Sequence, residues 1–495
     1  MLPLPRRAPV LVPDDGDGPF PFPPDFLWGV ATADHQIEHA QDDDWSAFEQ
    51  RVSEQRVSGT TERVSGTAPP VSGTIRGIGD VPAEWIAKKT DHDRLFADDF
   101  AEAAALGVRL YRFSISWARL FPRADMLEPD PAGVAFYDRL FDALVANGLT
   151  PFVTLFHFAL PRWLAEPDAS GRRGVERPDA PLAFERFAAA VAERYGDRVA
   201  HWCTINEPMV YAYAGYMEGI FPPHERRPTP AAIVPVLRGL LAMHARAYQA
   251  LHGVRHFTSG TSGVRHCHVG IAQHVRRFLP WRNSALDRIT AALIDAQFVR
   301  FFLDAIRDGE ARLPPFGPTL RVEGLRGTQD YVGVNYYGRF YVETTWRRPG
   351  KFTLHTFDPS EAADERSDLG WTADEEGLRL TLARFHRDYA LPLHILECGI
   401  ADDAPNDVRR QRFLVRHAQA TWRAIHHDAV PVKSFCYWSL LDNFEWAEGF
   451  DPRFGLLAVD YGGEFARRRR PSAEVYRDIA SANAVSAGLW RRYRR

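Results

Sequence analysis

Cysteine is scarce in this sequence of 495 residues, which holds only Cys203, Cys267, Cys398 and Cys436. Their spacing is too wide for a CxxC metal site, and four scattered thiols do not form the dense disulfide framework of a small secreted domain. We therefore expect a protein of a reducing compartment and predict a cytoplasmic location. We interpret Cys398 as a small buried apolar side chain rather than as a redox switch.

Long apolar runs and a strong net charge are also missing. No segment has the about 18 consecutive apolar residues of a transmembrane helix, and the N-terminal segment lacks the apolar core of a signal peptide. The formal net charge is −4 and the pI is near 6.5, so no overall field attracts nucleic acid or anionic lipid. We expect neither as a partner, and the sequence leaves the oligomeric state open.

The G-x-G-x-x-G turn of a dinucleotide-binding fold is absent, and short apolar runs alternate instead with helical patterns. The runs that predict strands lie at 26–32, 108–117, 149–157, 199–207, 268–273, 330–338, 391–399 and 432–443. The patterns that predict helices lie at 93–107, 132–148, 181–197, 229–252, 284–308, 374–389, 406–428 and 472–484. This alternation predicts an α/β fold, a single (β/α)8 TIM barrel with extended loops, and a doubly wound open sheet is the alternative.

Three segments lie outside this alternation. Residues 1–19 are expected to form a Pro/Asp-rich N-terminal tail and residues 486–495 a basic C-terminal tail, which leaves 20–485 for the barrel. Residues 51–77 repeat the motif R-V-S-G-T and contain almost no bulky apolar side chains. This composition predicts a mobile loop insertion between the first strand and the first helix.

The fourth expected strand ends abruptly in "TINEP", residues 204–208. Pro208 cannot continue the strand, and a residue before proline favours an extended backbone, so we expect an extended Glu207 where the strand meets a loop. A second glutamate, Glu397, lies at the end of the seventh expected strand. Strand ends of one barrel meet on one face. Two carboxyls about 5 Å apart at such a face are the pair that cleaves a glycosidic bond with retention.

Aromatic residues are concentrated near the same expected strand ends. A sugar offers C–H faces that stack on rings and hydroxyls that bind polar groups, so this combination predicts a carbohydrate pocket. Any one of these rings taken alone is better explained as part of the core. The set consists of Trp28, Trp117, Trp163, Trp438, Trp446, Tyr337 and Phe158.

Seven sequence blocks together resemble glycoside hydrolase family 1, the family of β-glucosidases and β-galactosidases. In chain order they are "FLWGVATADHQIE", "YRFSISWARLFP", "TLFHFALPRWL", "TINEP", "GVNYYG", "ILECGIADD" and "YWSLLDNFEWAEGFDPRFGL", and they extend from about residue 20 to 485. The resemblance implies a retaining exo-β-glycosidase that hydrolyses terminal non-reducing β-D-glucosyl residues through a covalent glycosyl-enzyme, without a cofactor. Galactosyl and fucosyl residues stay open as alternatives.

The resemblance also implies a role for each matching residue. Glu207 corresponds to the general acid/base and Glu397 to the nucleophile. Arg112 and Tyr337 correspond to groups beside the nucleophile, where a cation and a hydroxyl donor favour the ionised carboxylate. The residues implied to bind the substrate, a small β-glycoside or oligosaccharide, are Gln36, His157, Asn206, Asn335, Tyr337, Trp438, Glu445 and Trp446.

The sequence departs from the family pattern near these residues. Leu396 and Cys398 replace polar neighbours of the nucleophile, Phe158 and Ala159 replace a tryptophan and an aspartate, and His39 stands at a usual glycine. We expect an active enzyme with altered preferences.

The same residues bear on three other functions and on metal binding. A transglycosylase would use the same intermediate, and a catalytically weakened glycan-binding relative would keep the pocket. A phospho-glycosidase is disfavoured because the carboxylate of Glu445 would repel a sugar 6-phosphate. We predict no metal site, because His266 and His268 have no further ligand nearby in the sequence.

Overall fold

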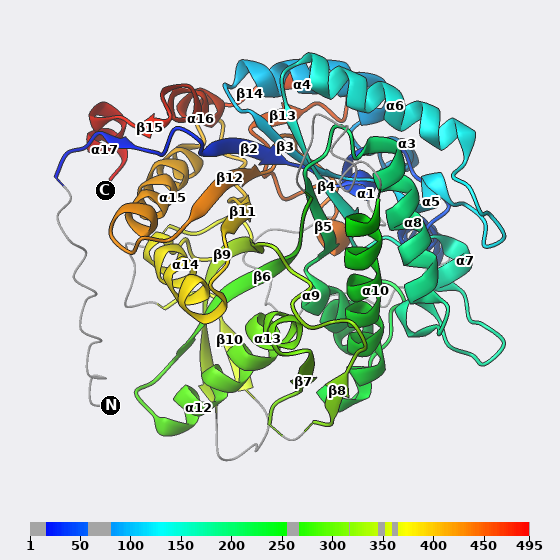
Figure 1. Ribbon diagram of the computed structural model, residues 1–495. Coiled ribbons are helices and arrows are strands. Elements are labelled where there is room, and N and C mark those ends of the chain that lie inside the picture. Colours follow the sequence, from blue (N-terminus) through cyan, green and yellow to red (C-terminus); the bar gives the residue numbers. More distant parts are fainter. Residues whose placement is uncertain are drawn as a thin grey trace.

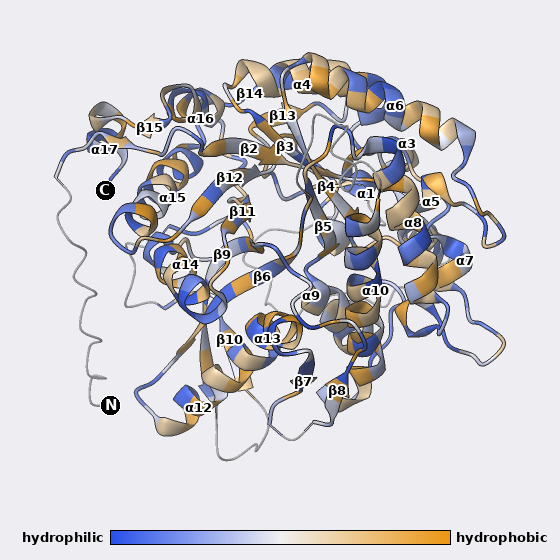
Figure 2. Cartoon of the chain, in the orientation of Figure 1, coloured by the Kyte–Doolittle hydropathy of each residue, from blue (hydrophilic) through white to orange (hydrophobic). Residues whose placement is uncertain are grey.

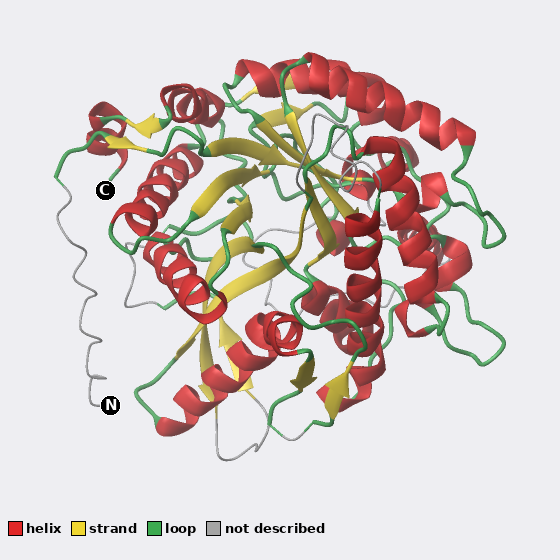
Figure 3. Cartoon of the chain, in the orientation of Figure 1, coloured by secondary structure: helices red, strands yellow, loops and turns green. Residues whose placement is uncertain are grey.

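The computed structural model describes residues 16–57, 81–254, 267–315, 317–344, 352–358 and 365–494. A closed ring of parallel strands forms its centre, and helices surround the ring (Figures 1 and 3). The strand order is β9-β11-β12-β2-β3-β4-β5-β6, and β6 pairs again with β9 to close the ring. The predicted (β/α)8 barrel is confirmed, and the open sheet is excluded.

Each of the eight predicted strands is present. Their bounds are β2 Leu27–Ala31, β3 Leu110–Ser114, β4 Thr150–Phe156, β5 His201–Asn206, β6 His268–Pro280, β9 Val332–Thr344, β11 Leu393–Cys398 and β12 Val432–Trp438. β6 and β9 are longer than expected because both continue past the barrel rim and stay paired there as far as Pro280 and Val342.

The predicted helices form the outer layer. Their bounds are α4 His92–Ala105, α6 Pro131–Ala146, α8 Ala180–Tyr195, α10 Val234–Gly253, α12 Ala285–Ile294, α13 Phe301–Asp308, α14 Glu375–Tyr389, α15 Val408–His426 and α16 Pro471–Ala482. They carry both hydrophobic and hydrophilic residues (Figure 2), as expected for helices between a core and solvent. Helix α6 begins with residues that favour a helix N-terminus. The side chain of Asp130 accepts hydrogen bonds from the backbone N–H groups of Ala132 and Gly133, and Pro131 is the first helical residue.

Shorter elements occupy the loops and edges. The helices are α1 Asp34–Ile37, α2 Asp44–Val57, α3 Ala83–Lys88, α5 Trp117–Leu120, α7 Arg162–Ala165, α9 Pro208–Tyr213 and α17 Ala487–Tyr493. The strands are β1 Phe20–Pro21, β7 Glu310–Arg312, β8 Thr319–Arg321, β10 Phe352–His355, β13 Leu457–Val459, β14 Arg467–Arg469 and β15 Ala484–Val485.

The core has two parts on opposite sides of the strands. The larger part fills the space between strands and helices, and the smaller part fills the barrel interior. The interior contains small side chains such as Ala31, Cys203 and Ala272 together with Phe152 and Leu396. A barrel of this size is filled by side chains rather than open, so chemistry takes place above this layer, at the carboxyl ends of the strands.

Some segments differ from the expectations. Residues 51–57 belong to helix α2 rather than to a loop, because the helix that begins at Asp44 continues through them, and residues 58–77 lie outside the described part of the chain. Residues 487–493 form helix α17 within the expected C-terminal tail, and Tyr493 is buried and donates to Gln411. β1 pairs with β15, so the two ends of the barrel segment lie side by side.

Within the described ranges, no helix is both long enough and apolar enough to cross a membrane.

Candidate active site

The eleven residues singled out from the sequence form one connected cluster at the carboxyl ends of the barrel strands, in which Trp438 also hydrogen-bonds Glu445. Each is joined to another member by a hydrogen bond or by ring stacking. Arg112, Asn206 and Asn335 are at most 1% exposed, and Glu397 and Glu207 are 4% and 6% exposed. These buried polar groups stabilise one another in place of water.

Glu397, at the end of β11, is held by two donors. Nη1 of Arg112 lies 2.5 Å from its Oε1, and the hydroxyl of Tyr337 donates to its Oε2 at 2.7 Å. Burial, and to a lesser extent the nearby Glu207, raises the pKa of the Glu397 carboxyl to about 7, although the guanidinium of Arg112 and the hydroxyl of Tyr337 both act to lower it. Both oxygens therefore accept hydrogen bonds, as suits an ionised carboxylate.

Glu207 follows β5 and is bound differently. Its Oε1 accepts Nδ2 of Asn335 at 2.8 Å and lies 2.9 Å from Nδ1 of His274. Burial acts to raise the pKa of Glu207, but the contacts with His274 and Asn335 and the charge of Arg112 outweigh it and lower that pKa. Whereas Arg112 donates directly to Glu397, the groups that hydrogen-bond Glu207 are an amide and an imidazole.

The backbone of Glu207 corrects one expectation. Its φ is 45° and its ψ is 58°, the left-handed region, where an extended conformation was predicted from Pro208. The fold overrides the local preference, since the Glu207 N–H donates to Ala272 O at 2.8 Å and Tyr211 N–H donates to Glu207 O at 3.1 Å. A left-handed backbone is strained for a residue other than glycine, and strain of this kind is concentrated at functional positions, where the surrounding structure maintains it.

Asn206 connects the two carboxyl groups. Its Oδ1 accepts Nη2 of Arg112 at 2.7 Å and Nδ2 of Asn335 at 3.0 Å. Its Nδ2 donates to Nε2 of His157 at 3.0 Å, so the remaining proton of His157 is on Nδ1. Burial, together with Arg112, holds the pKa of His157 well below its usual range, which keeps the imidazole neutral.

A second group of side chains comes from α1 and from the loop after β12. Nε2 of Gln36 donates to Asn443 Oδ1 at 3.1 Å and to Glu445 Oε2 at 3.4 Å. The ring of His157 stacks between those of Trp438 and Trp446, at centroid distances of 6.1 and 5.9 Å. This group forms an aromatic and amide wall adjoining the carboxyl pair.

Four polar atoms of this cluster are sealed from solvent and have no hydrogen-bond partner in the described chain: Gln36 Oε1, Arg112 Nε, His157 Nδ1 and Asn335 Oδ1. Buried polar atoms are normally satisfied, and leaving one without a partner is costly. Two acceptors and two donors without partners, together with two carboxyls and two tryptophans, suit a ligand that carries several hydroxyl groups.

Interruptions in the strand ladders aim the carboxyl groups. The pairing of β11 with β9 shifts between Ile395 and Glu397, and the pairing of β5 with β6 shifts between Cys203 and Asn206. In β11 the shift lets Leu396 enter the interior core while Glu397, its direct neighbour, still reaches the cluster. Such bulges re-aim side chains and are common next to active sites.

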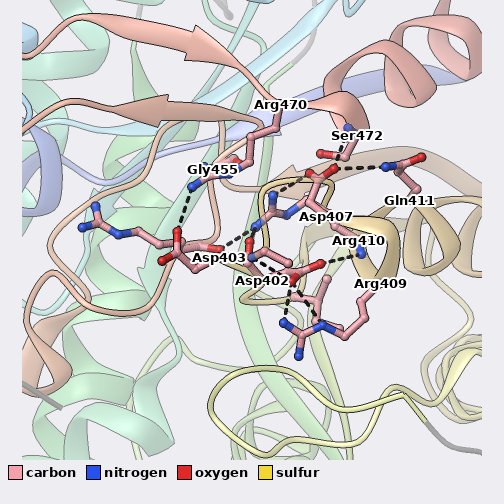
Figure 4. A network of polar contacts seen from close by, with 12 residues as sticks. Asp402, Asp403, Asp407, Arg409, Arg410, Gln411, Gly455, Arg470 and Ser472 are labelled. Atoms are coloured by element: carbon pink, nitrogen blue, oxygen red, sulfur yellow. Dashed lines mark hydrogen bonds and ion pairs between the residues drawn. The ribbon is translucent and has the colours of Figure 1, made fainter. Parts of the chain in front are cut away.

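A buried ion network supports the two loops that follow β11 and β12 (Figure 4). Nη1 of Arg470 donates to both oxygens of Asp442 at 2.9 Å, and Asp442 also accepts the backbone N–H of Gly455. Arg410 donates to Asp407 at 2.8 Å and to the carbonyl of Asp402 at 2.6 Å. These bonds stabilise the loop that carries Glu445 and Trp446.

The structure shows what each residue that departs from the family pattern contacts. Cys398 lies in the outer core, and burial raises the pKa of its thiol well above the ordinary value, in line with its interpretation as an apolar side chain. Phe158 contacts Trp446 at 5.1 Å and so provides an aromatic ring in the same wall. His39 hydrogen-bonds Asp91 at 2.7 Å.

Two tryptophans expected at the strand ends have other roles. Trp28 packs against Phe22 and Phe26 in the outer core, because it lies near the amino end of β2. Trp117 stacks on Phe187 at 5.3 Å and is also part of that core.

The sequence reasoning missed three side chains near the cluster. His274 was missed because the fifth expected strand, which corresponds to β6, was predicted to end at residue 273, one position earlier. His35 stacks on Trp446 at 5.8 Å, and Asp43 and Glu49 raise its pKa to about 9 against the effect of burial. Arg276 lies on β6 two residues beyond His274, and its guanidinium lies 4.0 Å from the ring centroid of Trp371.

A metal site is not apparent in the described residues: no three of their His, Cys, Asp and Glu side chains are grouped so as to hold an ion.

Comparison with known proteins agrees with this geometry. Residues 83–485 match the model of glycosyl hydrolase family 1. The chain is 34% identical to thermostable beta-glucosidase B of Thermobispora bispora, over 96% of this chain and 93% of the relative.

Solved structures give the same result. A beta-glycosidase from Pyrococcus horikoshii superposes with a TM-score of 0.79 at 34% identity, over 96% of this chain and 98% of that one. The beta-glucosidase from Thermotoga maritima in complex with galacto-hydroximolactam superposes with a TM-score of 0.76 at 29% identity, over 94% of this chain and 100% of that one. The chain therefore belongs to glycosyl hydrolase family 1 and is a retaining β-glycosidase that hydrolyses O-glycosyl bonds.

Proposed function

We propose that the protein removes terminal non-reducing β-D-glucosyl residues, with Glu397 as the nucleophile and Glu207 as the general acid/base. The observation that carries the assignment is the hydrogen-bonded chain Glu397–Arg112–Asn206–Asn335–Glu207. It places a carboxylate held by a permanent cation beside a second carboxyl that has no such cation. A double displacement needs these two environments.

In the first step, Glu397 Oε attacks the anomeric carbon while Glu207 gives its proton to the leaving oxygen, and a glycosyl ester forms on Glu397. In the second step, Glu207 takes a proton from water, which attacks the same carbon and releases Glu397. The donors from Arg112 and Tyr337 keep Glu397 reactive in the first step and stabilise it as a leaving group in the second.

The protonation states follow from the pair as a unit. Two buried carboxyls that repel each other do not both ionise readily, so together they retain one proton over a broad pH range. The permanent charge of Arg112 favours the negative charge on Glu397. We assign the shared proton to Glu207, because Arg112 donates directly to Glu397 and makes no hydrogen bond to Glu207 in the described residues.

The substrate group that enters the pocket is a sugar without phosphate. Gln36, Glu445, Trp446 and the Nδ1 of His157 present acceptors, a donor and a stacking ring, and none of them is a permanent cation. Burial and Glu397 raise the pKa of Glu445 to about 8, so its carboxyl both donates to and accepts from hydroxyls near neutral pH. The galacto-configured ligand of the Thermotoga maritima relative supports including galactosides, and fucosides, among the substrates to test.

Hydrolysis is favoured over transglycosylation because the similar curated proteins are named as glucosidases. We also propose a cytoplasmic location, which is supported by four cysteines that are all free thiols.

The experiment that tests the assignment compares Glu207→Gln with the wild type on phenyl and 2,4-dinitrophenyl β-glucosides. We expect kcat/KM on the phenyl substrate, which needs a proton donor, to fall by about 10²- to 10⁴-fold. On the dinitrophenyl substrate, azide should restore turnover and give β-glucosyl azide. Glu185→Gln, on the exposed surface of α8 and paired with Arg246, is the matched control. Equal losses on both substrates without azide rescue would refute the role of Glu207.

A further inference from the structure

Arg276 is a buried cation without a carboxylate partner. Its side chain lies on β6 with the residue only 4% exposed, and no Asp or Glu of the described residues forms an ion pair with it. The other deeply buried arginines differ, because Arg112 pairs with Glu397, Arg410 with Asp407 and Arg423 with Glu376. A buried cation is normally paired, so Arg276 needs an explanation.

Aromatic rings hold the guanidinium in place. The central carbon of Arg276 lies 4.0 Å from the ring centroid of Trp371, 4.5 Å from that of Phe340 and 5.9 Å from that of Tyr337. Its Nη1 donates to the carbonyl of Tyr337. These contacts fix the orientation of the side chain, yet none of them neutralises its charge.

The opposite edge of the guanidinium is available. Nε and Nη2 of Arg276 have no hydrogen-bond partner among the described residues, yet neither atom is sealed from solvent. The same edge of Arg282 binds both oxygens of Asp287, each at 3.0 Å. This edge is the fork that matches a planar oxyanion with two parallel hydrogen bonds.

The position of Arg276 relates it to the leaving group. The ladder between β6 and β9 shifts between Val275 and Arg277, so Arg276 occupies a bulge two residues beyond His274, which contacts Glu207. β6 runs outward at the barrel mouth, so Arg276 lies farther out than the acid/base carboxyl. The wall that would bind the sugar comes from α1, β4 and the loop after β12, whereas Arg276 and Trp371 belong to β6 and the segment after β10.

We propose that Arg276, fixed against Trp371, recognises an oxyanion, a carboxylate or a phosphate, on the aglycone of the substrate. This inference rests on the proposed function, because it takes Glu207 as the group that protonates the leaving oxygen. It extends that function by naming the substrate class, β-glycosides with an anionic aglycone. Burial lowers the pKa of Arg276 to about 9 even though the charge of the nearby Glu207 raises it, and a bound anion would offset this cost of burial further.

The test compares kcat/KM for 4-carboxyphenyl and 4-carbamoylphenyl β-glucosides, which differ in the charge of one substituent. For each protein, kcat/KM for the carboxyphenyl glucoside is divided by kcat/KM for the carbamoylphenyl glucoside. The wild-type value of this ratio is then divided by the value for Arg276→Met, so that differences between the two leaving groups cancel. We expect the ratio of ratios to favour the carboxylate at least tenfold, as for a charge-assisted bidentate pair. Arg277→Met is the matched control, because Arg277 is paired with Asp374, and it should retain the preference.

A 4-phosphonophenyl β-glucoside in the same series distinguishes the two oxyanions, and a preference for either one supports the proposal. A ratio of ratios near one for both anions would overturn it.

Calorimetry of 4-hydroxybenzoate and 4-hydroxybenzamide binding to the wild type tests the anion site without turnover, so it stays informative where Arg276→Met does not fold. Tighter binding of the benzoate with no hydrolysis of any glucoside would contradict the proposed function and leave the anion site standing. Equal binding of both compounds would overturn the anion site.

Discussion

Replacing Tyr337 by phenylalanine removes one hydrogen bond to Glu397 and leaves the ring in place. The hydroxyl donates to Oε2 of Glu397 at 2.7 Å, and the ring is held by His274 at 5.7 Å and by Trp371 at 5.9 Å. A hydrogen bond to a charged group contributes about 1.5 to 3 kcal/mol. If it acts fully on the reacting carboxylate, kcat/KM should fall by about 10- to 150-fold.

The pH dependence of kcat/KM tests the same hydrogen bond independently. Because the hydroxyl lowers the pKa of Glu397, its loss should raise that pKa and move the acid limb of kcat/KM to higher pH. The assay is the pH dependence of kcat/KM on 4-nitrophenyl β-glucoside. Tyr336→Phe is the matched control, since that hydroxyl donates to Asp374 at 3.1 Å rather than to a catalytic group. An unchanged kcat/KM together with an unmoved acid limb would refute the argument.

Three further predictions concern other parts of the molecule. His274→Phe should raise the pKa of the acid/base carboxyl and move the basic limb of kcat/KM to higher pH, and a shift to lower pH in the profile would contradict this. Burial lowers the pKa of His201 to about 4 and that of His394 well below its ordinary value, so the unfolded chain takes up these protons first. The free energy of unfolding should therefore fall as the pH decreases from about 6.5. His201→Phe should make Tm depend less steeply on pH, and a slope of Tm against pH identical to that of the wild type would refute this. Arg470→Met should lower the free energy of unfolding in urea by about 3 kcal/mol, because it removes the cation that binds both oxygens of the buried Asp442 and leaves only Arg453 of the described residues, 3.9 Å away. A loss below about 1 kcal/mol would show that the pair is dispensable.

Much of the fold was predictable because its signals are local. Each barrel strand is a short apolar or β-branched run bounded by glycine, proline or polar residues, and each major helix shows apolar residues at helical spacing. The closed ring follows from eight such repeats. Helix α17 and residues 51–57 of α2 were not predicted, because a basic segment and a polar repetitive segment carry weak helical patterns.

The site was predictable to the extent that its residues stand at strand ends. Glu207, Glu397 and Asn335 were located in this way, whereas His274 was missed by the placement of one strand end. The left-handed backbone of Glu207 and the bulge that turns Glu397 toward Arg112 depend on neighbouring strands, so no local pattern reports them. Trp28 shows the converse error, since a tryptophan near a strand also packs in the core.

The most direct test of the central claim is to trap the intermediate. The protein is incubated with 2,4-dinitrophenyl 2-deoxy-2-fluoro-β-glucoside, digested, and its peptides are analysed by mass spectrometry. The account predicts time-dependent inactivation and one fluoroglucosyl label, on Glu397. A label on another residue, or steady hydrolysis of aryl β-glucosides without any labelled peptide, would contradict it.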